Sequence, residues 1–132
     1  MSALNATTLG CSLTCKDVTA TINWYESVLG FTVGYRFERD GKPAGAIVNN
    51  GDINIVLNQD DGALGWDRIK GQGFYLQINV ASPADVDAAA VRIKTAGGTL
   101  IDEPADRPWG VRMFQFRDPD GFKLGVSTPL GE

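Results

Sequence analysis

The sequence contains no histidine, and this absence limits the chemistry that its side chains can do. A His-based catalytic triad, a histidine general base and a histidine metal ligand are all excluded. Tyr75 and Lys123 are the remaining candidates for acid–base chemistry, and each would need a strongly shifted pKa to act. Arg112 and Arg117 are suited to pairing with an anionic ligand. The residue types therefore favour a binding protein over an enzyme.

Two further pairs have the residue types of a reactive site, but their surroundings favour structural roles. Asp118 and Asp120 flank a proline and precede a glycine, so we interpret them as turn formers and not as catalytic carboxylates. Arg117 is then either solvated or paired with one of them. Cys11 and Cys15 share one face of a predicted strand and are expected to be small buried hydrophobes, the alternative being a redox or metal pair. A disulfide between them would require the strand to bend sharply.

The segment 109–127 predicts a half-buried hairpin. Its turn, Asp118-Pro119-Asp120-Gly121, combines a fixed proline dihedral with a glycine that tolerates positive φ. Apolar residues fall at every second position and form the expected core face: Phe114, Phe116, Phe122, Leu124 and Val126. The other face is aromatic and polar, as in a binding cleft: Trp109, Val111, Met113, Gln115, Lys123, Gly125 and Ser127.

Two helices are indicated by capping residues and apolar spacing. Asp17 is the expected N-cap of a helix over 18–28, and Gly30 is the expected stop. Ser82 caps a second helix with Pro83 at its first position, which ends before Gly97-Gly98. In the first helix Trp24 and Tyr25 are expected in or beside the core.

Strands are predicted by alternation over 9–15, 31–39, 44–48, 53–57, 74–80 and 99–101, with the hairpin following. Leu9 and Phe74 belong to the inward faces of their strands. The order strand, helix, three strands thus occurs twice, with an offset of roughly 65–70 residues, and such internal repeats govern a fold. We predict an α+β fold in which residues 1–132 form one domain of two modules, about 9–58 and 73–128. Residues 59–72, polar and glycine-rich, are the expected linker.

Composition narrows the function classes. The chain has 132 residues, 43% hydrophobic and 21% charged, with a formal net charge of -4, which is typical of a soluble globular domain. No basic patch is visible, so we do not expect a nucleic-acid partner. No apolar run reaches membrane-spanning length and no signal peptide is recognised, so we expect a cytoplasmic protein without a membrane partner.

These motifs together resemble the glyoxalase/bleomycin-resistance/extradiol-dioxygenase superfamily, also called vicinal oxygen chelate proteins. The resemblance rests on Asp17, on Asn-Trp-Tyr-Glu-Ser-Val-Leu-Gly-Phe at 23–31, on Ala96-Gly97-Gly98 and on Arg-Asp-Pro-Asp-Gly-Phe at 117–122. It implies two βαβββ modules, a homodimer, and clefts on the concave sheet faces that are shared across the dimer. Fold resemblance does not by itself establish function.

Enzymes of that superfamily hold a divalent metal with His and Glu side chains from four strands. The resemblance places those positions at Gly10, Val56, Tyr75 and Gly125, and none of these carries an imidazole or carboxylate. We therefore expect no metal of the family type and no other cofactor. The expected relatives are the metal-free, bleomycin-resistance-like binding proteins.

Two tryptophans are the proposed stacking residues. The segment Arg107-Pro108-Trp109-Gly110-Val111-Arg112 resembles one in the bleomycin-resistance type, where the tryptophan stacks on a flat ligand. The alternative for Trp109 is a packing role at a dimer interface. Trp66, in the linker, is either a second stacking face or a hydrophobic plug over the module junction.

The remaining ligand contacts are expected on the concave faces. The amides among them suit a polar, uncharged ligand, although the same pattern also fits the solvated face of an antiparallel sheet. These residues are Ser12, Thr14, Asn54, Val56, Asn58, Tyr75, Gln77, Asn79, Met113, Gln115, Lys123 and Ser127. The prediction is a protein that sequesters a planar, antibiotic-like small molecule. The alternatives are a metal-independent isomerase or lyase that uses Tyr75, and a non-catalytic regulatory domain.

Overall fold

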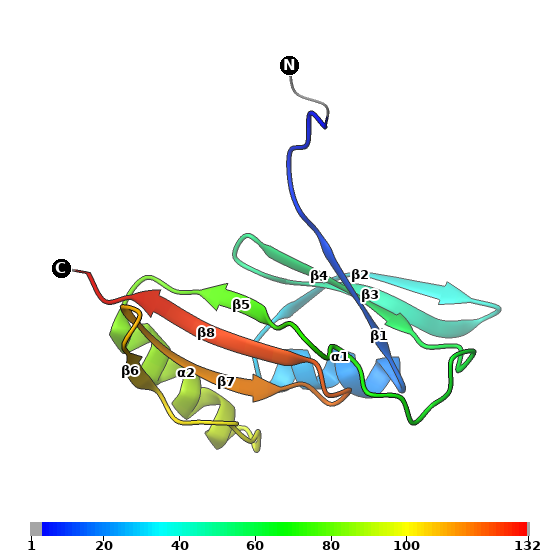
Figure 1. Ribbon diagram of the computed structural model, residues 1–132. Helices are drawn as coiled ribbons and strands as arrows, with labels where there is room; N and C mark the ends of the chain where they lie inside the picture. Colours follow the sequence, from blue (N-terminus) through cyan, green and yellow to red (C-terminus); the bar gives the residue numbers. More distant parts are fainter. Residues whose placement is uncertain (1–3, 132) are drawn as a thin grey trace.

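The computed structural model describes residues 4–131, which form two similar modules (Figure 1). The first module contains β1 Cys11–Cys15, α1 Val18–Ser27, β2 Thr32–Arg39, β3 Lys42–Asn50 and β4 Ile53–Gln59. The second contains β5 Leu76–Asn79, α2 Pro83–Thr95, β6 Ala105–Arg107, β7 Val111–Arg117 and β8 Lys123–Pro129. The predicted repeat of strand, helix and three strands is confirmed.

Each module forms one four-stranded sheet with the same strand order. Sheet A runs β1-β4-β3-β2 and sheet B runs β5-β8-β7-β6. The first strand of each module pairs in parallel with the last, and the remaining pairs are antiparallel. Figure 1 shows α1 against sheet A and α2 against sheet B, both on the lower side of the view. We call the sheet face away from its helix the open face.

Local chemistry explains the first helix. The side chain of Asp17 accepts a hydrogen bond from the Ala20 amide at 3.1 Å, as an N-cap does. Gln59 at the end of β4 accepts one from the Val18 amide at 3.0 Å. The helix is followed by Gly30 at φ +77°, a conformation that disfavours other residues. The sequence and the neighbouring strand thus fix both ends of α1.

The second helix follows the same rules. Ser82 accepts a hydrogen bond from the Asp85 amide, and Pro83 occupies the first turn. Asp85 lies in the first turn, while Arg92 and Lys94 lie in the last, which complements the helix dipole. Neither helix among residues 4–131 has the length and apolar character needed to cross a membrane.

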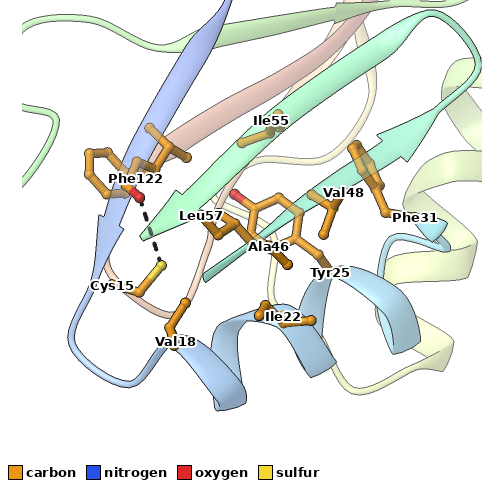
Figure 2. Packing of buried hydrophobic residues seen from close by; sticks show 11 residues of the cluster. Cys15, Val18, Ile22, Tyr25, Phe31, Ala46, Val48, Ile55, Leu57 and Phe122 are labelled. Carbon is orange, nitrogen blue, oxygen red and sulfur yellow. Dashed lines mark hydrogen bonds between the residues drawn. The ribbon is translucent and has the colours of Figure 1, made fainter. Parts of the chain in front are cut away.

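Each sheet buries one face against its helix, as the alternation predicts. The first core cluster surrounds Tyr25 and Leu57 and is shown in Figure 2. The second surrounds Phe114, Phe116 and Leu124. Cys15 is buried in the first cluster and Cys11 is half-buried; both are free thiols, in agreement with their interpretation as small hydrophobes.

Three sequence-based predictions of element extent are wrong. Leu9 lies before β1 and is 99% exposed, and Phe74 lies before β5 and is largely exposed. The segment 99–101 makes only a single bridge, from Leu100 to Phe116, and the strand at this place is 105–107. In each case the alternating pattern continues past the last residue that has a neighbouring strand to pair with, and pairing defines a strand.

The two modules meet through α1, through the β7–β8 turn and through Leu76 of β5, which packs against the first core cluster. Phe122, immediately before β8, packs in the core of the first module. Trp24 of α1 packs against Phe116 at 6.2 Å between ring centroids. The hairpin predicted from the sequence therefore also joins the modules.

Candidate functional site

The open face of sheet B carries a row of hydrogen-bonded polar side chains. The Tyr75 hydroxyl donates to Gln77 Oε1 at 3.4 Å, and Gln77 Nε2 donates to Asn79 Oδ1 at 2.8 Å. Ser127 on the adjacent strand also donates to Asn79 Oδ1, at 3.5 Å. The sequence prediction that these residues share a face is consistent with this row.

The Tyr75 ring lies over a glycine and beside a cation. A Cβ atom at Gly125 would lie 3.1 Å from the ring, so a larger residue there would displace Tyr75. The Lys123 ammonium lies 5.9 Å from the ring centroid, within the range of a cation–π contact. Gly125 therefore gives Tyr75 the space to lie against β8.

A cavity of about 410 Å³ lies at this end of sheet B. Its walls are the segment before β5 and the facing ends of β7 and β8. They comprise Ile69, Lys70, Gly71, Gln72, Gly73, Phe74, Tyr75, Arg117 and Lys123. Its volume lies within the range of small-molecule sites. Of the residues predicted to bind ligand, Tyr75 and Lys123 line this cavity, as does Arg117, which the sequence indicated as a possible partner of an anionic ligand; Phe74 was assigned to the core face of its strand.

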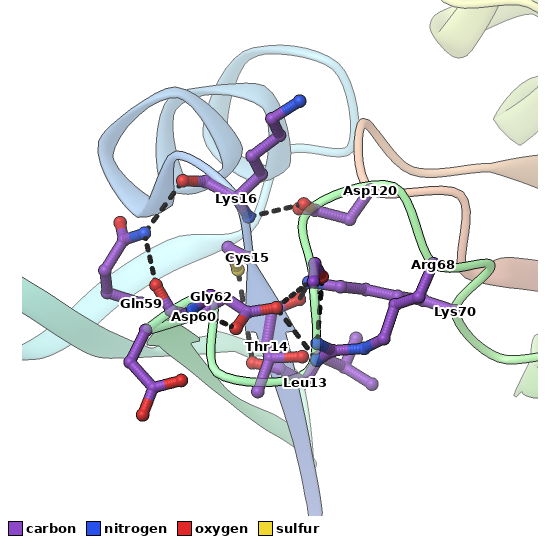
Figure 3. A network of polar contacts seen from close by, with 12 residues as sticks. Leu13, Thr14, Cys15, Lys16, Gln59, Asp60, Gly62, Arg68, Lys70 and Asp120 are labelled. Atoms are coloured by element: carbon purple, nitrogen blue, oxygen red, sulfur yellow. Dashed lines mark hydrogen bonds and ion pairs between the residues drawn. The ribbon is translucent and has the colours of Figure 1, made fainter.

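The segment that walls this cavity is held by a buried carboxylate (Figure 3). Asp60 accepts from Arg68 and Lys70, each at 2.8 Å, and from the Gly62 amide at 2.9 Å. The hydrogen bond from Lys70, followed by that from Gly62, lowers the pKa of Asp60. Lys70 also donates to the Thr14 carbonyl at 3.1 Å, which ties the segment to β1. Sequence reasoning missed this network, because its members are separated by irregular chain.

The two aspartates of the β7–β8 turn do more than form the turn. Asp118 accepts from the Asp120 and Phe122 amides and, at 2.8 Å, from the buried Tyr25 hydroxyl. Asp120 accepts from the Lys16 amide at 2.7 Å and from Thr21 at 2.8 Å. The Asp118 carboxylate thus stabilises the turn, as predicted, whereas both carboxylates also join the turn to α1 and the residues before it, which was not predicted.

Burial shifts the pKa values of Asp118 and of its donor Tyr25. Desolvation raises the pKa of Asp118 above its ordinary value, and the hydrogen bonds that it accepts oppose this. Desolvation, together with the neighbouring Asp118 charge, raises the pKa of Tyr25 well above its ordinary value. Tyr25 therefore stays a hydrogen-bond donor, and the pair is structural.

Arg112, Met113 and Ser127 are less available to a ligand than the sequence indicated. Arg112 forms ion pairs with Asp87 at 2.9 Å and Asp106 at 3.0 Å, so it is already neutralised. Met113 and Ser127 point to the open face but are buried at 5% and 3% exposure, so neither offers much contact surface. Alternation alone does not reveal this burial.

Arg117 is exposed to solvent and is not paired with an aspartate of the turn. Its guanidinium donates to the Gly121 carbonyl at 3.0 Å, and no ion pair of Arg117 occurs among residues 4–131. Of the two predicted alternatives, solvation is therefore confirmed and pairing with Asp118 or Asp120 is not, because both carboxylates accept hydrogen bonds from other groups.

The predicted contacts of sheet A lie apart from those of sheet B. Asn58 donates to Ser12 Oγ across the β1–β4 pair, and Val56 is half-buried beside them. Thr14 and Asn54 lie on the same two strands. Within one chain the structure does not bring these residues to the cavity at Tyr75.

The two candidate stacking tryptophans are also separate from this cavity. Trp109 is 68% exposed in the turn before β7, next to Gly110, whose carbonyl accepts from the Leu130 amide. Because β7 runs from Val111 to Arg117, this turn lies about 20 Å from the cavity end of the strand. Trp66 is half exposed and lies over Gly62 in the connecting segment.

The donor set does not fit the metal of the superfamily enzymes. Of Gly10, Val56, Tyr75 and Gly125, only Tyr75 has a side-chain oxygen. Among residues 4–131, no three His, Cys, Asp or Glu side chains gather closely enough to hold a metal ion. Divalent metals in proteins need several imidazole, thiolate or carboxylate ligands. No chemical step through such a metal is therefore derived for this site.

Comparison with known families agrees with this fold. The sequence profile of the Glyoxalase/Bleomycin resistance protein/Dioxygenase superfamily matches residues 6–126. The chain belongs to this superfamily. No curated protein sequence matches this superfamily member.

Solved structures show the same architecture in other superfamily proteins. A glyoxylase/bleomycin resistance protein/dioxygenase domain from Frankia sp. EAN1pec is 26% identical, covers 94% of this chain and 92% of its own, and superposes with a TM-score of 0.78. A glyoxalase/bleomycin resistance protein/dioxygenase from Nocardioides is 21% identical over 98% of this chain and 87% of its own, with a TM-score of 0.77. TioX from Micromonospora sp. ML1 is 22% identical over 95% of this chain and 100% of its own, with a TM-score of 0.72. These likenesses establish the fold.

Proposed function

We propose that this superfamily member is a metal-free protein that binds and sequesters a planar, aromatic, antibiotic-like small molecule on the open face of sheet B. The observation that carries the proposal is the cavity of about 410 Å³ beside Tyr75, where exposed aromatic rings adjoin a row of amide side chains. Aromatic rings supply stacking area, and amides supply both donors and acceptors. This combination orients a flat ligand without requiring a reactive group.

A homodimer would complete the cleft. The open face of sheet A holds Asn58 and Val56, and Tyr35 on that face is 63% exposed and stacks on Phe37 at 6.2 Å between centroids. An exposed aromatic pair over a polar sheet face is suited to closing over a ligand held by another surface. In the proposed dimer, sheet A of one protomer faces sheet B of its partner, so both sets of predicted contacts line one cleft.

Tyr75→Ala and Trp109→Ala test the binding surface. Tyr75→Ala should weaken the binding of a planar aromatic compound at least about tenfold, because it removes a stacking face worth about 0.5–1.5 kcal/mol beyond its buried area. Trp109 lies about 20 Å from the cavity, so Trp109→Ala should weaken only a compound long enough to reach from the cavity to that turn. A panel of planar antibiotics, metal-free bleomycin included, is titrated by calorimetry with EDTA present. Val91→Ala, on the exposed side of α2, is the control and should bind as the unmodified chain does.

The outcomes separate the alternatives. Unchanged affinity in Tyr75→Ala would remove the cavity from the site, and unchanged affinity in Trp109→Ala would leave that residue a packing role. Turnover of the bound compound that disappears in Tyr75→Phe would replace sequestration by a metal-independent isomerase or lyase activity. A chain that binds none of these compounds but retains a protein partner would favour the interpretation as a regulatory domain.

A further inference from the structure

The side chains that line the cavity beside Tyr75 carry a net positive charge, whereas the whole chain is negatively charged. The protein carries a formal net charge of -4, yet the nine residues around the cavity include Lys70, Arg117 and Lys123 and no aspartate or glutamate. A concave wall with cations of one sign concentrates the field on its occupant. The cavity is therefore electrostatically suited to an anion.

Two of the three cations lack a negative partner in the described part of the chain. The Lys70 ammonium is neutralised by Asp60 at 2.8 Å. Arg117 donates to the Gly121 carbonyl and the Lys123 ammonium lies over the Tyr75 ring, and neither charge is paired with a carboxylate among residues 4–131. The site thus keeps two positive charges available.

The positions of these two cations are unfavourable without a ligand. Arg117 and Lys123 are register partners, directly opposite each other at the end of the β7–β8 pair, and both point to the open face. Like charges at such positions destabilise a sheet. An anion between them would remove this repulsion and gain charge-assisted hydrogen bonds from both.

Aromatic rings lie next to this cationic pair. Phe74 and Tyr75 form part of the same wall, at 53% and 37% exposure. We infer that the ligand of this cavity is an aromatic acid whose oxyanion, a carboxylate or phosphate, lies between Arg117 and Lys123 while its ring contacts Phe74 and Tyr75. This inference rests on the proposed function and specifies the class of its ligand. It replaces the uncharged ligand that the amide-rich face suggested from sequence.

Matched ring compounds test the charge requirement. Calorimetric titration of the full chain compares 2-naphthoate and 2-naphthyl phosphate with the neutral 2-naphthamide, and inorganic phosphate is the anion without a ring. The two acids should bind at least about tenfold more tightly than the amide, and raising the salt concentration should weaken only the acids. The better of the two acids identifies the oxyanion.

Substitutions of Arg117 and Lys123 test whether these two cations cause the preference for acids over the amide. Lys123→Gln and Arg117→Gln should each weaken acid binding about threefold to tenfold and leave the amide unchanged. Lys42→Gln is the charge-matched control. Lys42 begins β3 in sheet A and does not line the cavity of its own chain, so this substitution should leave acid binding unchanged.

Each result has a distinct meaning. Equal binding of acid and amide would overturn the inference and leave the proposed binding of aromatic compounds intact. Binding of inorganic phosphate as tight as that of the acids would retain the anion site and contradict an aromatic ligand, and with it the proposed function. Acid binding that is insensitive to both variants would place the anion elsewhere, and absence of all binding would overturn both proposals.

Discussion

Cys15 illustrates how burial controls reactivity at the scale of a residue. Its thiol is 1% exposed, and desolvation, with the charge of Asp120, raises its pKa to about 12. Desolvation also raises the pKa of the half-buried Cys11. A thiol is a nucleophile only as its thiolate, so neither residue is suited to redox or covalent chemistry at neutral pH.

We expect Cys15 in the native chain to resist alkylation by iodoacetamide at pH 8, because both its burial and its raised pKa suppress the thiolate. Mass spectrometry of the native and the urea-unfolded protein measures the modified fraction. Modification of Cys15 in the folded state at the rate of a free thiol would contradict the buried environment. Cys11 should react faster than Cys15 and more slowly than in the unfolded chain.

Asp60 makes stability depend on pH in a defined direction. Because hydrogen bonds and the charges of Lys70 and Arg68 lower its pKa in the folded state, its stabilising contribution is present above its ordinary pKa and is lost as the pH falls through its folded pKa. Asp118, whose pKa is raised, acts in the opposite direction and favours the folded state as the pH falls from neutral toward its ordinary value.

The variant Asp60→Asn separates these effects. It should lower the free energy of unfolding at pH 7, and the difference from the unmodified chain should shrink as the pH falls below about 4. Urea denaturation at pH 7, 5 and 3.5 measures this difference. Asp61→Asn, whose carboxylate accepts only from the Ala63 amide, is the control. A difference that grows at acid pH would contradict the role of Asp60.

At the scale of an element, α1 is determined both by its own sequence and by contacts with the rest of the chain. Its own residues largely determine where it begins and ends and its inner face packs on sheet A, while Thr21 and Tyr25 also donate hydrogen bonds to the β7–β8 turn of the other module. Tyr25 is fully buried and donates to Asp118 across 93 residues of chain. A buried carboxylate without its donor costs more than the bond itself contributes.

Tyr25→Phe should therefore destabilise the fold by about 1–3 kcal/mol, because it leaves a buried Asp118 oxygen without its hydroxyl donor. The double variant Tyr25→Phe with Asp118→Asn should be less destabilised than the sum of the single variants, because the two groups interact. Denaturation of the four proteins gives the coupling. Strictly additive effects would show that the contact across the modules contributes little.

At the scale of the whole molecule, the modules share a core. Phe122 belongs to the second module by sequence but packs among Cys15, Tyr25 and Leu57 of the first. Segments that bury each other's apolar groups tend to unfold together. The two modules are therefore expected to unfold in one transition.

Phe122→Ala tests this shared core. The substitution should lower stability by about 3–5 kcal/mol, as for other buried phenylalanines, with a single transition retained. Phe74→Ala, which removes a largely exposed ring, is the matched control and should change stability by less than about 0.5 kcal/mol. Circular dichroism during urea denaturation distinguishes the two. Two separate transitions would show that the modules fold independently.

Local patterns in the sequence determined both helices, their caps, the repeat of strand order and the hairpin at 111–129. Each depends on residues a few positions apart: Asp17 caps its own helix, and alternation separates Phe114 and Phe116 from the open face. The same local patterns overextended the strands at Leu9 and Phe74, because strand ends depend on a pairing partner elsewhere in the chain.

Tertiary structure alone decided which distant groups meet. The sequence identified Tyr75, Arg117 and Lys123 as candidate site residues and predicted the hairpin that pairs the last two, but only the course of residues 69–75 forms a cavity beside them. The contacts of Asp118 with Tyr25 and of Asp60 with Lys70 likewise arise when separate segments dock. Periodicity records which face a residue takes, whereas the partner on that face is set by long-range packing, which a single sequence does not display.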